Sequence, residues 1–123
     1  MKLILVEDDP LILMCTSDAL VEAGFDVQMA ARGEEALELL TDTTDCLLMM
    51  LDVRLPGDID GWEVARRARN ARPDIAIVYT TTADAVVFDR ECVDRNVLLQ
   101  KPYTLDHAVT SAREACRIVE QGT

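Results

Sequence analysis

A set of polar residues stands directly after four short apolar runs of this sequence. The set consists of Glu7, Asp8 and Asp9, then Asp52, then Thr80, and finally Lys101. Carboxylates that lie close together repel one another unless they share a proton or a cation, and oxygen ligands with retained water suit Mg²⁺. A carboxylate beside a cation, an ammonium and a hydroxyl can attack a phosphoryl group, because these groups stabilise the charge on the moving oxygens. The residue types therefore indicate phosphoryl transfer to an aspartate, provided that the fold brings them together.

That condition is met if the apolar runs are strands of one parallel sheet, and strand and helix patterns do alternate five times. The expected strands are residues 3–6, 25–29, 46–51, 75–79 and 97–100. The expected helices are residues 10–23, 34–40 and 61–71, a weakly specified segment within 83–96, and a last helix from residue 105. Strict alternation predicts an α/β fold with right-handed crossovers and helices on both faces of the sheet. In such a sheet the functional site lies beyond the carboxyl ends of the strands, where the polar set would meet.

The first helix has clear signals at both ends. Asp9 is suited to be its N-cap, Pro10 to occupy its first position, and Gly24 to end it. Residues at three- and four-residue spacing should face inward, namely Ile12, Cys15, Ala19, Leu20 and Ala23. Asp9 therefore fits better as a helix cap than as a metal ligand.

In the helix at residues 61–71, the exposed side is expected to carry Arg66, Arg67 and Arg69.

Each member of the polar set also has an ordinary structural interpretation. An aspartate at the end of a strand is often only a turn former or a helix cap. A threonine in such a place is usually structural, and Lys101-Pro102 could be a surface turn. The joint occurrence of all these residues, after four strands and in this order, favours a functional site.

These motifs together resemble the receiver domain of bacterial two-component response regulators, over essentially all 123 residues. The matching segments are ILVEDDP at residues 4–10, MLDVRLPG at 50–57, DG at 60–61, YTT at 79–81 and LQKP at 99–102. The resemblance implies a flavodoxin-like (βα)5 fold, a doubly wound five-stranded parallel sheet with strand order 2-1-3-4-5. We therefore expect one receiver domain over residues 1–123, without an effector domain.

The resemblance also implies an acceptor and a metal site. Asp52 would be the phosphorylated residue. The cofactor Mg²⁺ would be bound directly by Asp8, through water by Glu7, and by Asp52 and the backbone carbonyl of Arg54. The Arg54 side chain could pair with the phosphoryl group or the acids, or simply point into solvent.

Three further residues would bind the phosphoryl group or respond to it. Thr80 resembles the switch hydroxyl of the family, with Thr81 beside it, and Lys101 resembles the lysine that pairs with the acceptor. The position three residues before Lys101, which often holds an aromatic residue in the family, is Leu98 here. Coupling of Thr80 to a swinging aromatic ring on the fifth strand is therefore not expected.

The sequence specifies a loop, the fourth helix and two single side chains less strongly. The loop at residues 56–61 is one residue longer than the commonest spacing in the family. Because the fourth helix is weakly specified, we expect the region 83–98 to be mobile and to change most on phosphorylation. Trp62 is expected to pack in the core or contact a partner, and His107 to be an ordinary exposed side chain.

Composition and resemblance together limit the partners. A net charge of −11 disfavours binding to nucleic acids and anionic lipids, and no apolar run approaches the length of a membrane span. With no signal-peptide pattern, a cytoplasmic location is expected. The resemblance implies a sensor histidine kinase or a histidine phosphotransfer protein as donor. Output would pass to an unknown downstream protein, or the domain would drain phosphate from a shared kinase. No enzymatic activity is expected beyond its own phosphorylation and dephosphorylation.

Three alternatives remain open at this point. A phosphatase of the haloacid dehalogenase type needs a second aspartate two residues after the nucleophile, where this chain has Arg54. A flavodoxin-like cofactor binder needs a first loop that cradles phosphate, whereas residues 7–9 are all acidic and would repel it. A degenerate receiver that is never phosphorylated would lack key residues, and all of them are present.

Overall fold

The short apolar runs form strands and the segments between them form helices in the computed structural model, which describes residues 1–82 and 85–121. The strands are β1 (Lys2–Val6), β2 (Asp26–Ala30), β3 (Leu48–Asp52), β4 (Ala76–Thr81) and β5 (Asn96–Gln100). The helices are α1 (Pro10–Glu22), α2 (Gly33–Asp42), α3 (Gly61–Ala71), α4 (Ala85–Glu91) and α5 (Leu105–Gln121). The predicted alternation is confirmed, including a short helix within 83–96, of which residues 83–84 lie outside the described part.

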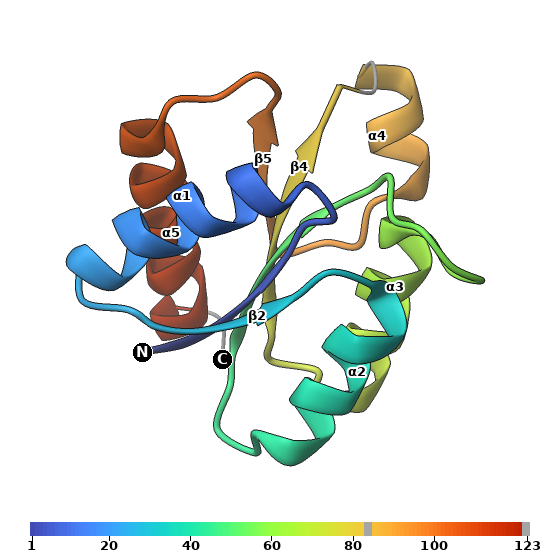
Figure 1. Cartoon of the computed structure of the whole chain (residues 1–123). Coiled ribbons are helices and arrows are strands. Elements are labelled where there is room, and N and C mark those ends of the chain that lie inside the picture. Colours follow the sequence, from blue (N-terminus) through green and yellow to red (C-terminus); the bar gives the residue numbers. More distant parts are fainter. Residues whose placement is uncertain (83–84, 122–123) are drawn as a thin grey trace.

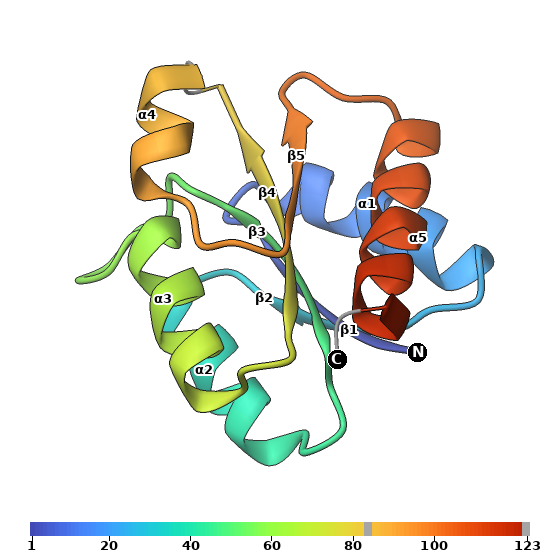
Figure 2. The ribbon, with the colours of Figure 1, turned by 180° about the vertical axis from the view of Figure 1, so that it is seen from behind.

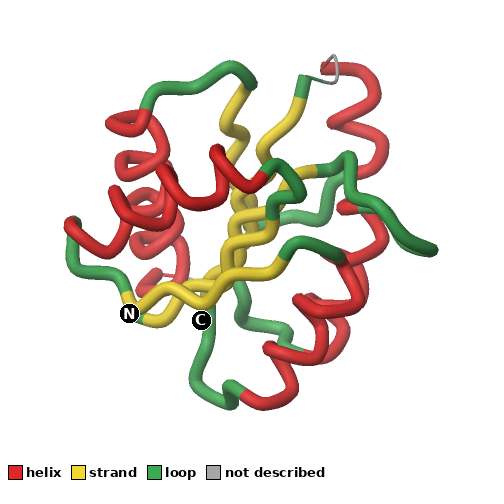
Figure 3. The backbone as a smooth tube through the Cα atoms, in the orientation of Figure 1, coloured by secondary structure: helices red, strands yellow, loops and turns green. Residues whose placement is uncertain are grey.

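The five strands form one parallel sheet in the order β2-β1-β3-β4-β5, which confirms the predicted topology (Figures 1 and 3). All five residues of the central strand β3 are buried, as expected for a strand covered on both faces. Asp52 is the last residue of this strand rather than the first of the following loop. The acceptor candidate is therefore held by the sheet itself.

Helices cover both faces of the sheet. The helices α1 and α5 lie on one face, and α2, α3 and α4 lie on the other (Figures 1 and 2). Alternate residues of β1 supply the two cores, because successive side chains of a strand point to opposite faces: Leu3 and Leu5 pack on the α1 and α5 side, whereas Ile4 and Val6 pack on the α2 and α3 side. The amino terminus of the chain lies at the opposite end of the sheet from the carboxyl ends of the strands (Figure 1).

The helix ends follow the predicted chemistry. The Asp9 carboxylate accepts hydrogen bonds from the backbone N–H groups of Leu11 and Ile12, at 3.0 and 3.2 Å, so its predicted role as the cap of α1 is confirmed. Gly24 ends α1 with a φ of +103°, which favours glycine because a Cβ is strained there.

Two orientations predicted from helical spacing are wrong. Cys15 is exposed, because α1 turns Thr16, Ser17 and Leu20 toward the sheet instead. The Arg69 side chain is only 16% exposed, because its guanidinium donates to the backbone carbonyls of Ile75 and Asp94, at 2.8 and 2.7 Å. Helical spacing carries no information about carbonyl groups that a long side chain can reach elsewhere in the fold.

Candidate functional site

Three carboxylates meet at the carboxyl ends of two neighbouring strands. Glu7 and Asp8 follow β1, Asp52 ends β3, and these strands pair directly in the sheet. One carboxylate oxygen from each of the three residues lies within 4.8 Å of the other two. Glu7 and Asp52 are buried, whereas Asp8 is exposed. Such a concentration of negative charge requires a counter-charge.

Lys101 supplies part of that counter-charge. Its ammonium donates to Glu7 Oε1 at 2.7 Å and to Asp52 Oδ2 at 2.8 Å. Burial raises the pKa of Glu7, an effect that its hydrogen bond from Lys101 opposes. Burial alone would lower the pKa of Lys101, but its hydrogen bonds to Asp52 and Glu7 outweigh that effect and raise it. A charged lysine therefore bridges the two buried acids.

The remaining oxygens of the two buried carboxylates are held by backbone groups. Asp52 Oδ1 accepts from the N–H of Arg54 at 3.0 Å, and Glu7 Oε2 accepts from the N–H of Asp9 at 3.1 Å. Each carboxylate is thus fixed by one backbone donor and by Lys101. Such pre-positioned dipoles and charges favour chemistry in which charge develops on a bound group.

The two threonines end the strand beside the acceptor. Thr80 pairs with Asp52 in the register of β3 and β4, and the Thr80 carbonyl accepts from the N–H of Val53 at 3.3 Å. The Thr81 carbonyl accepts from the N–H of Lys101 at 2.9 Å. Both threonines are buried. Their backbones therefore link the acceptor strand to the lysine.

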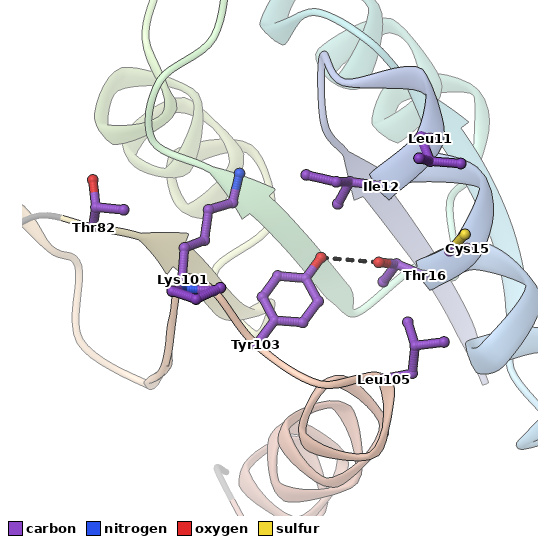
Figure 4. Close-up of a pocket in the computed structure, with 9 residues that line it drawn as sticks. Leu11, Ile12, Cys15, Thr16, Thr82, Lys101, Tyr103 and Leu105 are labelled. Atoms are coloured by element: carbon purple, nitrogen blue, oxygen red, sulfur yellow. Dashed lines mark hydrogen bonds between the residues drawn. The ribbon is translucent and has the colours of Figure 1, made fainter.

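Two contacts at the site were not predicted from the sequence. A Cβ on Gly61 would stand only 2.3 Å from the backbone oxygen of Asp52, so α3 begins directly against the acceptor. The Tyr103 hydroxyl lies 2.9 Å from the Thr16 hydroxyl across the space between α1 and the segment that follows β5 (Figure 4). The exposed side chain of Arg54 lies outside the buried cluster.

A largely apolar groove opens beside Lys101, with a volume of about 510 Å³. It is lined by Leu11, Ile12, Cys15, Thr16, Thr82, Lys101, Pro102, Tyr103 and Leu105 (Figure 4). The outer side of α1 adds an exposed apolar face formed by Leu11, Met14 and Val21, of which 70%, 62% and 54% is exposed. An apolar surface of this kind next to a charged site is typical of a contact region.

Comparison with known proteins places this arrangement in a family. A family model described as the response regulator receiver domain matches residues 3–117. The chain belongs to the response-regulator receiver family. As a receiver domain, it has the family fold with its acidic cluster at the carboxyl edge of the sheet.

Relatives of this receiver domain include response regulators of mycobacteria. The response regulator MprA of Mycobacterium avium is 31% identical over 120 residues, covering 95% of this chain and 51% of the relative. The transcriptional regulatory protein TcrA of Mycobacterium tuberculosis is 33% identical over 118 residues, covering 94% of this chain and 46% of the relative. The receiver domain thus spans about half the length of these relatives.

The fold agrees with solved receiver structures. The crystal structure of a response regulator receiver protein from Sinorhizobium medicae WSM419 superposes with a TM-score of 0.89 at 28% identity, covering 97% of this chain and 96% of that chain. A CheY-like receiver domain from Methanospirillum hungatei JF-1 superposes with a TM-score of 0.86. Within residues 1–82 and 85–121, no helix has the length and apolar character needed to cross a membrane.

Proposed function

We propose that Asp52 accepts a phosphoryl group and that this domain acts as a phosphorylation switch in a two-component pathway. The observation that carries the proposal is the position of Lys101, whose ammonium bonds both Asp52 and Glu7 at the edge where Asp8 joins the cluster. A nucleophilic carboxylate beside a fixed positive charge is the arrangement that phosphoryl transfer needs.

The chain's own residues supply most of the chemistry. An Asp52 carboxylate oxygen forms the new bond to phosphorus while the bond from phosphorus to the donor imidazole nitrogen breaks. The electron pair of that bond stays on the nitrogen, and because the other ring nitrogen already carries a proton, the donor leaves as neutral imidazole. Lys101 already lies 2.8 Å from Asp52 Oδ2 and would neutralise a phosphoryl oxygen. The Thr80 residue is in register with Asp52, and its hydroxyl would donate a hydrogen bond to a second phosphoryl oxygen. Thr81 lies beside it.

The donor set suits Mg²⁺, because this ion prefers carboxylate oxygens and retains water, and the exposed Asp8 leaves the cluster open to solvent. Glu7, Asp8, Asp52 and the backbone carbonyl of Arg54 would hold it. When bound, it would supply positive charge for the phosphoryl oxygens. Glu7 and Asp52 already share Lys101, so the metal would complete a counter-charge that is only partly present.

A phosphohistidine on a sensor kinase or phosphotransfer protein is the proposed donor. The groove is lined by Lys101, which bonds Asp52, and by Leu11 of the exposed apolar face of α1. This supports docking of a helical donor with an apolar surface. Output would pass to a downstream protein, or the domain would act as a phosphate sink. We propose that the domain catalyses only its own phosphorylation and dephosphorylation. We also propose that it is located in the cytoplasm.

Incubation with acetyl phosphate and Mg²⁺ tests the acceptor. Mass spectrometry should find one added phosphate that is stable in acid and labile in base, and Asp52→Asn should remove it. Asp58→Asn is the matched control, because Asp58 is exposed on the nearby loop and should leave the labelling intact. Undiminished labelling of Asp52→Asn would show that the proposed acceptor is wrong.

A further inference from the structure

Three aromatic rings from three elements meet on the α3 side of the sheet. The ring of Tyr79 in β4 lies 5.1 Å from that of Trp62 in α3 and 5.6 Å from that of Phe88 in α4, and the Trp62 and Phe88 rings lie 6.2 Å apart. Tyr79 is fully buried, and it meets Phe88 edge-on, at an interplanar angle of 87°. Such tilted and edge-on pairs add specific attraction to the area that they bury.

The Tyr79 hydroxyl adds a directional contact to this aromatic cluster. It accepts a hydrogen bond from the backbone N–H of Val93 at 3.0 Å, two residues beyond the end of α4. The segment around α4 is therefore tied to β4 at two points, the Phe88 ring and the Val93 amide. Because the hydroxyl is buried, losing its partner would leave a polar group unsatisfied.

The same cluster reaches the acceptor through α3. Trp62 follows Gly61, which lies against the backbone of Asp52, and Tyr79 precedes Thr80, which pairs with Asp52. The position on β5 that often holds an aromatic residue in the family is Leu98 here. Its side chain has no ring and is 39% exposed. Among the described residues, the aromatic contact to α4 comes from β4 and α3 instead.

We propose that Trp62, Tyr79 and Phe88, with the hydrogen bond from Val93 to Tyr79, form a latch that holds α4 on the sheet, and that α4 moves by opening this latch. The link from the latch to Thr80 and phosphorylation rests on the proposed function. The role of the latch in holding α4 on the sheet does not depend on the proposed function.

A surface contact offers a weaker alternative tie. Arg66 Nη1 lies 3.4 Å from the Glu91 carbonyl and 4.0 Å from its carboxylate. The Arg66 side chain is 45% exposed, and exposed ion pairs contribute little to stability. The buried cluster is therefore the stronger constraint on α4.

Amide hydrogen exchange on the metal-free protein tests the latch. Tyr79→Phe keeps the ring and removes only the hydroxyl, so exchange at Val93 should accelerate about fivefold, as expected for the net loss of one ordinary hydrogen bond. Tyr103→Phe is the matched control, since it removes the other tyrosine hydroxyl, on the α1 side, and should leave Val93 unchanged. The proposal is overturned if Val93 exchange is unchanged in Tyr79→Phe, accelerates equally in Tyr103→Phe, or accelerates uniformly along the chain.

Trp62 is the only tryptophan and therefore reports the ring contacts. Phe88→Leu should shift its emission to longer wavelength, because the ring loses cover, and an unchanged emission would remove Phe88 from the latch. Beryllofluoride with Mg²⁺ should change the same emission in the native sequence. If Asp52 accepts phosphate but the emission stays constant, the link to phosphorylation is wrong. Undiminished labelling of Asp52→Asn instead removes the proposed function and leaves the metal-free tests of the latch intact.

Discussion

The backbone oxygen of Asp52 occupies the space into which a side chain on Gly61 would project, 2.3 Å from the position of a Cβ. Gly61→Ala must therefore displace either α3 or the acceptor strand. We expect a loss of about 1–3 kcal/mol in the free energy of unfolding, the usual cost of overpacking, together with slower labelling by acetyl phosphate. Gly24→Ala separates the two effects, because a Cβ there meets nothing within 4 Å. It should destabilise through its positive φ and leave the labelling rate unchanged.

Removing the ammonium of Lys101 should expose the repulsion between the two buried acids. We expect Lys101→Met to lower the free energy of unfolding by about 3 kcal/mol, because it leaves charges buried without a partner. Adding Glu7→Gln should recover part of that loss, since one of the two repelling charges is then gone. Urea unfolding of the two single variants and the double variant measures this coupling. Strictly additive effects would mean that Lys101 and Glu7 do not interact through the bond seen here.

Millimolar Mg²⁺ should stabilise the folded protein, since a ligand that binds only the folded state raises the melting temperature. Asp8→Asn should abolish that increase while changing metal-free stability little, because the side chain is exposed. Asp58→Asn, an exposed acid outside the cluster, should respond to Mg²⁺ like the native sequence. A melting temperature that rises equally in all three proteins would indicate nonspecific binding and contradict the site.

The parallel sheet and the meeting of three acids at its carboxyl edge could be predicted from the sequence, because both depend on local patterns, whereas the strand order was implied only by the resemblance to receiver domains. Uniformly apolar runs that alternate with helical segments imply a parallel sheet, and the acids stand immediately after two of those runs. Asp9 was likewise identifiable as a cap, because its partners are only two and three residues away. Local spacing is sufficient where the interacting groups are neighbours in the chain.

Contacts between distant segments could not be predicted in this way. Tyr79 bonds an amide fourteen residues away, and Tyr103 meets Thr16 across the groove. Arg69 appeared to be a solvated surface residue because its helical position says nothing about the carbonyls near Ile75. The hydrogen-bond partners of these side chains depend on how the helices pack against the sheet, and the hydrophobic pattern does not specify that packing.

Arg72 provides a test of such long-range contacts. Its guanidinium donates to the carbonyls of Leu40, Thr43 and Cys46 at 2.8, 2.7 and 3.1 Å, and so ties the end of α2 to the start of the segment leading into β3. Arg72→Met should lower the free energy of unfolding by about 2–3 kcal/mol, because several charge-assisted bonds are lost. Arg67→Met, which removes an exposed pair with Glu63, should cost less than about 1 kcal/mol. Chemical denaturation measures both losses. Equal losses of unfolding free energy in Arg72→Met and Arg67→Met would refute the distinction between the two arginines.

Stability should decline at alkaline pH because of Tyr79. Burial raises its pKa to about 12 in the folded protein, whereas the pKa of a tyrosine in an unfolded chain is about 10. The unfolded chain therefore loses this proton first, so the contribution is complete below about pH 10 and is lost as the pH rises toward about 12, by about 2–3 kcal/mol. Tyr79→Phe should be less stable at neutral pH but should show a smaller alkaline decline. Parallel declines in urea unfolding between pH 8 and pH 11 would contradict this.

The exposed apolar face of α1 also has a consequence for the behaviour of the protein in concentrated solution. Leu11, Met14 and Val21 face solvent on a molecule with a net charge of −11, so electrostatic repulsion between copies opposes their association through this face. At about 1 M salt the screening length falls to about 3 Å, and sulfate strengthens apolar association further. We therefore expect high salt, by weakening the long-range repulsion, to favour self-association of this domain through the apolar face of α1.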